Sequence, residues 1–166
     1  MSISRRAFVV RCAALACVPA ATARVLAAAP PASRRMTVYK DAGCGCCKAW
    51  IAHLERAGFT VTSRDVPDIN EIKQSLGVPD AMASCHTGVI GSVLIEGHVP
   101  ADVIAKFVDQ QADPTQRVAK WKGLAVPGMP QGSPGMEGPN PQRYDVLSFG
   151  AGGATAVYAT RMGTRA

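Results

Sequence analysis

Three thiols fall within four residues of this chain, in the run Cys44–Cys47 (CGCC), and a Cys85-His86 pair follows further along. The run stands between a short β-like segment, 36–40, and the start of a helical pattern. A thiol at a helix N-terminus tends to ionise, because the helix dipole and the free N–H groups stabilise the thiolate. Thiolate is the form that attacks disulfides and the form that binds soft metals. The run therefore predicts either thiol redox chemistry or metal binding.

The first 29 residues are typical of an export signal. An SRRAFV motif at 4–9 resembles a twin-arginine signal, a weakly apolar stretch continues to position 26, and small residues suited to cleavage follow at 27–29. Arg11 and Arg24 interrupt the apolar stretch, which favours a cleaved leader over a retained membrane span. We therefore expect a periplasmic protein with no membrane attachment after cleavage.

The formal net charge of +6 comes from this N-terminal region. Six of the 18 basic residues precede Met36 and no acidic residue does, so the 12 that remain equal the 12 acidic residues. A nucleic-acid-binding domain needs a basic face, and this balance predicts none.

Cysteine usage changes in the same way once the leader is removed. Cys12 and Cys17 leave with it, and four of the six cysteines remain. The periplasm permits disulfides, but three of these four thiols are too close together to link distant segments. The remaining chain is long enough to form one hydrophobic core without such links.

The apolar pattern after position 35 alternates between strand and helix spacing. A capping residue, Asp68, and two glycines, Gly58 and Gly77, mark helix ends, and Gly91-Ser92 is typical of a hairpin turn. The order β-α-β-α-β-β-α predicts a thioredoxin-like α/β fold, in which helices cover a mixed sheet, over residues 36–113. The expected strands are 37–39, 59–66, 88–90 and 93–95, and the expected helices begin near positions 47, 68 and 100.

The composition changes after Asp113-Pro114. Residues 124–141 are rich in Pro and Gly, which predicts a loop without regular structure. Two strand-like segments flank Gly150–Gly153 and predict a β-hairpin that is too short to fold alone. We expect four segments: a leader at 1–29, a disordered stretch at 30–35, the thioredoxin-like domain at 36–113, and a loop and hairpin at 114–166 that pack on it.

The expected topology brings the reactive residues together. In a thioredoxin-like sheet, the first strand-to-helix loop, the loop before the third strand and the loop after the fourth strand all lie at one end. These loops carry Cys44–Cys47, Cys85-His86 and the GHVP segment at 97–100. The four remaining thiols and two of the three histidines should therefore meet at one surface.

These motifs, with SCHT at 84–87, IEGHVPA at 95–101 and GLAVPGMP at 123–130, resemble the CopG-type periplasmic metal-binding proteins, a family long labelled a domain of unknown function. The resemblance covers about residues 36–161. It implies a thioredoxin-like fold, copper(I) bound at the cysteine run and a role in copper resistance, with other periplasmic copper carriers as partners and copper oxidoreductase activity left open. The implied metal ligands are Cys44, Cys46, Cys47 and Cys85, and the resemblance carries over His86, Met129 and Met136 as candidates. We predict His86 as a ligand or as a group that orients one, and His98, which the topology places nearby, as a further candidate.

Copper(I) also fits the residues on chemical grounds. It is soft, prefers thiolate and thioether ligands, and accepts two to four of them. The CGCC sulfurs are too close together to ligate one tetrahedral ion comfortably, which favours bridging thiolates and a small polynuclear cluster. Zinc fits less well, because structural zinc usually draws on two well-spaced ligand pairs.

A thiol-disulfide oxidoreductase is the main alternative function. Cys44 would be the attacking thiol of a C-x-x-C motif and Cys47 the resolving thiol. Against it, Cys46 offers a competing partner, and His86 stands where thioredoxins usually carry a cis-proline nearby. A third possibility is inert: a Cys44–Cys47 disulfide, with Cys46 and Cys85 buried as small apolar residues.

Each remaining candidate also has a structural interpretation. His98 could simply shape a loop, and Met129 and Met136 could fill apolar gaps. We expect His53 and Glu96 to be solvated. Trp50 and Trp121 are expected to be core and docking residues.

Overall fold

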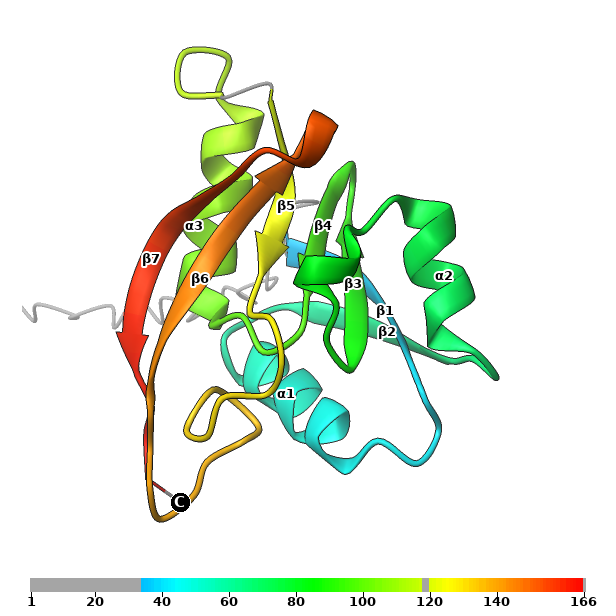
Figure 1. The fold of residues 1–166 in the computed structure, drawn as a ribbon, viewed down its shortest axis with the longest axis vertical. Helices are drawn as coiled ribbons and strands as arrows, with labels where there is room; N and C mark the ends of the chain where they lie inside the picture. Colours follow the sequence, from blue (N-terminus) through cyan, green and yellow to red (C-terminus); the bar gives the residue numbers. More distant parts are fainter. Residues whose placement is uncertain (1–33, 118–119, 166) are drawn as a thin grey trace, which may run out of the picture.

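The described part of the chain forms a seven-stranded mixed sheet with three α-helices (Figure 1). A computed structural model describes residues 34–117 and 120–165; the predicted leader, 1–29, lies outside these residues. Within them, no helix is long and apolar enough to cross a membrane. The elements are β1 (Arg35–Lys40), α1 (Gly45–Arg56), β2 (Thr60–Asp65), α2 (Ile69–Leu76), β3 (His86–Ile90), β4 (Val93–Glu96), α3 (Ala101–Ala112), β5 (Trp121–Ala125), β6 (Arg143–Gly150) and β7 (Thr155–Met162).

The order of elements from β1 to α3 is the one that the sequence predicts. The sheet runs β2-β1-β3-β4-β5-β6-β7. β1 is parallel to β2 and antiparallel to β3, and β3 is antiparallel to β4. The predicted mixed α/β fold is confirmed, and this arrangement is compatible with a thioredoxin-like sheet.

Local chemistry explains where the first two helices begin and end. The Cys44 sulfur caps α1 by accepting a hydrogen bond from the N–H of Cys47 at 3.3 Å. Asp68 caps α2 by accepting from the N–H of Asn70 at 2.7 Å, as its residue type predicts. Gly77 ends α2 with a φ of 73°, a left-handed conformation that a side chain would disfavour.

The fifth strand corrects the sequence analysis. A loop is expected from Leu124 onward, but Leu124 and Ala125 belong to β5 and pair in parallel with Ile95 and Glu96 of β4. Both residues are fully buried, so the apolar character of this Leu-Ala pair is explained by a place inside the sheet. The following Pro/Gly-rich residues, 126–142, do form a loop.

The C-terminal hairpin is present and longer than its sequence suggests. β6 pairs with β5 on one side and with β7 on the other, and a register shift interrupts the β6–β7 ladder between Val146 and Leu147. The hairpin therefore extends the main sheet through β5.

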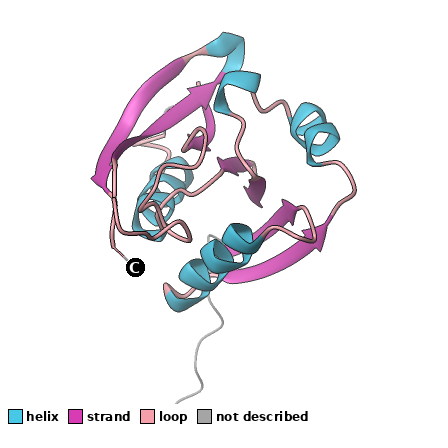
Figure 2. Cartoon of the chain, turned by 60° about the horizontal axis from the view of Figure 1, so that its bottom comes forward, coloured by secondary structure: helices cyan, strands magenta, loops and turns pink. Residues whose placement is uncertain are grey.

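The two faces of the sheet carry separate cores. One core joins α1 and α3 to the sheet and includes Trp50, Leu54, Ile104 and Phe107. The other gathers residues that follow α2 against β4, β5 and β6 and includes Val78 and Phe149. Figures 1 and 2 accordingly show α2 well apart from α1 and α3.

His53 is half-buried, where the sequence suggests a solvated side chain. Its Nε2 accepts a hydrogen bond from the N–H of Ala101 at 3.1 Å and so links α1 to the start of α3. Burial lowers the pKa of His53, the charge of Arg56 lowers it further, and Glu137 and Asp102 oppose the shift. The neutral ring is therefore the form that the folded protein favours.

Replacing His53 with glutamine should reduce the loss of stability between pH 7.5 and 5. The folded-state pKa of His53 lies below its usual 6.5, so the unfolded chain takes up the proton first as the pH falls. The free energy of unfolding therefore decreases as the pH falls below 6.5. A glutamine Oε1 can accept from Ala101 without titrating. Denaturant unfolding of both proteins at each pH measures the effect, and equal pH slopes would contradict it.

Candidate metal centre

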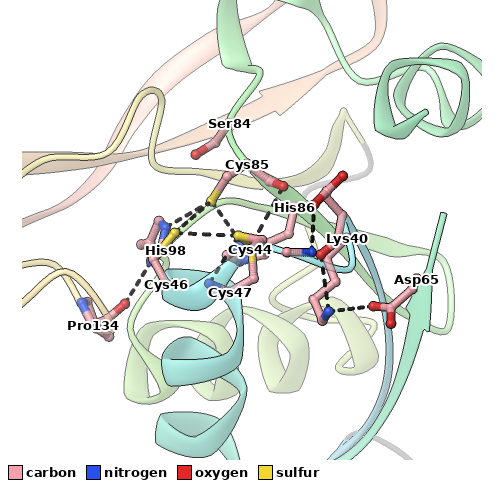
Figure 3. The surroundings of a disulfide bond; sticks show 12 residues. Lys40, Cys44, Cys46, Cys47, Asp65, Ser84, Cys85, His86, His98 and Pro134 are labelled. Atoms are coloured by element: carbon pink, nitrogen blue, oxygen red, sulfur yellow. Dashed lines mark hydrogen bonds and ion pairs between the residues drawn. A yellow bond between two sulfur atoms is a disulfide. The ribbon is translucent and has the colours of Figure 1, made fainter. Parts of the chain in front are cut away.

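Three loops meet at one end of the sheet, as the topology predicts (Figure 3). The first ends at Cys44 and continues into the first turn of α1, which carries Cys46 and Cys47; the other two precede β3 and α3 and carry Cys85 and His98. The sulfur atoms of Cys44, Cys46, Cys47 and Cys85 all lie within 4.8 Å of one another. A second group with the same spacing joins Cys85 to ring nitrogens of His86 and His98. Cys85 therefore belongs to both groups.

Two of the four thiols are joined. Cys44 and Cys47 form a disulfide, and Cys46 and Cys85 are free. The Cys46 sulfur lies 3.5 Å from that of Cys44 and 3.8 Å from that of Cys85. In this state only Cys46 and Cys85 offer thiols, and reduction of the disulfide would supply two more.

The two halves of the disulfide differ in accessibility. Cys47 is fully buried, and its sulfur lies 3.8 Å from the carbonyl oxygen of Cys85. Cys44 is partly exposed at the start of α1. A reagent from solvent therefore reaches the sulfur of Cys44 first.

The surroundings of His98 determine its tautomer. Its Nδ1 lies 2.8 Å from the carbonyl oxygen of Pro134, which can only accept, so Nδ1 carries the hydrogen. Burial lowers the pKa of His98, which favours a neutral ring. Nε2 is then unprotonated and lies 3.0 Å from the sulfur of Cys85, so it is available as a metal ligand.

His86 lies inside the protein against Trp50, with the ring centroids 4.2 Å apart. The pKa of His86 is lowered to about 3, mainly by burial; the positive charge of Lys73 acts in the same direction, as does that of His98 when its ring is protonated. Its Nδ1 is 3.2 Å from the sulfur of Cys85. Its Nε2 is buried without a hydrogen-bond partner among the described residues. The ring is therefore neutral and incompletely satisfied, as suits a residue beside a metal.

Burial has the opposite effect on Cys85. Together with the smaller effect of the neighbouring Cys46, it raises the pKa of this thiol to about 12. Without a metal, Cys85 is thus a neutral thiol at neutral pH. A bound ion would have to displace its proton, as thiolate-binding metals do.

The two candidate methionines lie on the loop between β5 and β6. Met129 is 53 % exposed and Met136 is half-buried. The loop is attached near the thiols at two points: Ser84 Oγ donates to the carbonyl oxygen of Gly128 at 2.5 Å, and His98 donates to that of Pro134. The hydrogen-bonded group of cysteines and histidines contains neither thioether, so their role as ligands stays a prediction.

Gly135 brings this loop into contact with α1. Its φ is +84°, and a Cβ built on it would lie 2.7 Å from the backbone nitrogen of Trp50 and 2.8 Å from the carbonyl oxygen of Cys46. Only glycine fits this contact without a backbone shift. The loop that orients His98 is thereby fixed against the helix that carries the cysteine run.

Glu96 is a further correction to the sequence analysis. It is fully buried, whereas a charged residue near a strand end suggests solvation. Its carboxylate pairs with the buried Lys73 and accepts from Thr87 Oγ1 at 2.6 Å and from the N–H of Ser84 at 2.7 Å. Burial raises the pKa of Glu96, and the Lys73 charge opposes the rise. Lys73 lies four residues after Ile69, on the apolar side of α2. This spacing is the one feature of the sequence that indicates a buried lysine, which would need a buried acidic partner.

Comparison with known proteins identifies the family. Residues 82–136 match a family model described as "Protein of unknown function, DUF411". Two solved structures, "Copper resistance protein copG- Form 2" and "Form 1", are each 46 % identical to this chain. The match to the first covers 76 % of this chain and 97 % of the solved chain, with a TM-score of 0.68. The match to the second covers 78 % of this chain and 98 % of the solved chain, with a TM-score of 0.69. No curated protein matches.

The chain belongs to the CopG copper-resistance family. Membership of this family, with a cysteine cluster that could hold a metal ion, supports a role in copper resistance. The CxCC run at 44–47 and Cys85, on which the predicted resemblance rested, lie at one site in this CopG-family chain.

Gly135→Ala should destabilise this CopG-family protein more than a matched glycine substitution. Gly152 also has a positive φ, +68°, but a Cβ there would meet nothing within 4 Å. We expect Gly152→Ala to cost about 1–2 kcal/mol from backbone strain alone. Gly135→Ala should cost about 1–3 kcal/mol more, because the loop must also move away from α1.

Denaturant unfolding measures both costs, and ring-nitrogen NMR shifts of His98 report whether its Nδ1 still donates to Pro134. Equal destabilisation by the two substitutions, with unchanged His98 shifts, would show that the contact at Gly135 does not hold the loop.

Proposed function

We propose that this protein is exported to the periplasm, where it binds copper(I) through cysteine thiolates and serves copper resistance. The proposed ligands are Cys44, Cys46, Cys47, Cys85 and His86, with His98 as a further ligand. One observation supports the proposal most: two separate segments bring four sulfur atoms within 4.8 Å of one another, beside two buried imidazoles.

The donor set favours copper(I) over zinc. Thiolates are soft ligands, and copper(I) accepts them in low coordination numbers without strict geometry. Structural zinc would normally stabilise a fold that lacks a core, but this chain has an extensive apolar core that includes Leu54 and Phe107. Four sulfurs this close together also suit bridging between ions. We therefore propose a polynuclear copper(I) site in the reduced protein.

Export by the twin-arginine route is part of the same proposal. The predicted leader at 1–29 carries the motif, and this route carries folded proteins. The thiols could then be organised by the sheet before they meet an oxidising compartment. Copper ions, supplied by or passed to other periplasmic copper carriers, are the proposed partners.

Anaerobic titration of reduced protein, residues 30–166, tests the proposed site. We expect more than one tightly held copper(I) ion per chain, counted by metal analysis after gel filtration. The same protein with the Cys44–Cys47 disulfide intact should bind fewer ions, because it has only two free thiols. Cys85→Ser should also lower the count, since Cys85 is common to both groups of candidate ligands.

Retention of a single zinc ion with no uptake of copper(I) would contradict the copper proposal and favour a structural zinc site. Oxygen uptake during oxidation of bound copper(I), sustained over many turnovers, would identify a copper oxidoreductase. A stoichiometric change without turnover would identify a carrier.

A thiol-disulfide oxidoreductase is the second candidate function. The Cys44–Cys47 disulfide supports it, since the bond lies at the start of α1 and its more accessible sulfur belongs to Cys44. If this is the function, insulin reduction should survive Cys46→Ser and be lost with Cys44→Ser. Loss of activity with both variants, or activity with neither, would argue against it.

A further inference from the structure

A buried ion pair lies behind the Cys85 loop, away from the sulfur atoms. Lys73 of α2 pairs with Glu96, the last residue of β4, and both side chains are almost inaccessible to solvent. Thr87 of β3, which is paired with Glu96 across the ladder, accepts from the Lys73 ammonium at 3.0 Å and donates to the carboxylate. The pair thus connects α2 to two central strands.

The carboxylate of Glu96 also reaches the loop itself. Its Oε1 accepts from the N–H of Ser84 at 2.7 Å, and Ser84 immediately precedes Cys85. The side chain of Ser84 is fixed too, because its Oγ donates to the carbonyl oxygen of Gly128. Gly97, with a φ of +69°, packs so close to Ser84 that an added Cβ would clash with its side chain. Ser84 is therefore held by contacts with three other residues.

Stability alone is a poor explanation for this arrangement. Moving two charges out of water is costly, and well-packed apolar residues in place of a buried ion pair often stabilise a protein as well or better. A carboxylate, in contrast, has lone pairs enough to accept from Lys73, Thr87 and a backbone N–H together. Leucine at position 96 could fill the space but could not hold the N–H of Ser84.

We propose that Glu96, held in place by Lys73 and Thr87, is a positioning residue that fixes Ser84 and thereby sets the position of the Cys85 sulfur between Cys46 and His98. The inference rests on the proposed copper site for its functional meaning. Groups that hydrogen-bond to the segment that carries a metal ligand orient that ligand, and their loss typically weakens metal binding 10- to 100-fold.

Two double variants separate the effect of the side-chain oxygen at position 96 from the effect of the two buried charges. Lys73→Met with Glu96→Gln removes both charges but keeps an oxygen that can accept from Ser84. Lys73→Met with Glu96→Leu removes the same charges and the oxygen as well. We expect the Gln variant to keep copper(I) affinity within about threefold of wild type, and the Leu variant to bind at least tenfold more weakly, in competition with a copper(I) chelator.

Two measurements on the metal-free, reduced proteins report position without copper. The amide hydrogen of Ser84 should exchange at least tenfold faster in the Leu variant than in the Gln variant. Iodoacetamide should also alkylate Cys85 at least tenfold faster in the Leu variant than in the Gln variant, as measured by peptide mapping. If wild type takes up no copper(I), the proposed function fails, while these two measurements still decide the positioning role.

Equal copper affinity, amide exchange and alkylation in the two double variants would overturn the inference. If the Leu variant does not fold, Ser84→Pro and Ser84→Ala replace the pair. Both lose the Oγ contact, but only proline lacks the N–H that Glu96 accepts, and Ala83 before it has a ψ of 139° that a following proline tolerates. Weaker copper binding and faster Cys85 alkylation in Ser84→Pro alone would support the inference, and equal behaviour would overturn it.

Discussion

The antiparallel pairing of β3 with both β1 and β4 is the constraint on which the site depends. Lys40, the last residue of β1, is paired with His86, the first residue of β3. On the other side, Thr87 is paired with Glu96, the last residue of β4. Because the end of one strand lies beside the start of the next, the segments that carry the CGCC run, Cys85 and His98 all lie at the same end of the sheet. No interaction within any single loop could bring these residues together.

The same geometry supports copper binding and disulfide chemistry, and the difference lies in the state of Cys44 and Cys47. Joined, they leave Cys46, Cys85 and the two imidazoles, which is a small donor set. Reduced, they add two sulfurs at the N-terminus of α1, where the helix dipole favours thiolate. The Cys44 sulfur already accepts a hydrogen bond from the N–H of Cys47 in the oxidised state. The helix would therefore keep its cap when the reduced Cys44 ionises.

Much of this arrangement could be predicted from the sequence, because it follows from local patterns. Period and capping residues give the elements up to α3, and their order gives the meeting of the loops. β5 was missed because a segment of five residues next to a Pro/Gly-rich stretch has little pattern of its own, and its strand character comes from pairing with distant β4. Glu96 was misjudged for a related reason: its partners, Lys73 and Ser84, come from other segments, and only the fold reveals the burial.

Charge around the site bears on how many ions it could hold. Four thiolates carry four negative charges, which a single copper(I) ion would leave largely uncompensated. Two buried lysines already have a counter-charge each. Lys40 is paired with Asp65 (Figure 3), and Lys73 is paired with Glu96. The imidazoles of His86 and His98 are held neutral by burial and add none. With these two buried cations paired and the histidines neutral, a cluster of close thiolates is best balanced by several copper(I) ions bound among them, which favours the polynuclear form of the proposal.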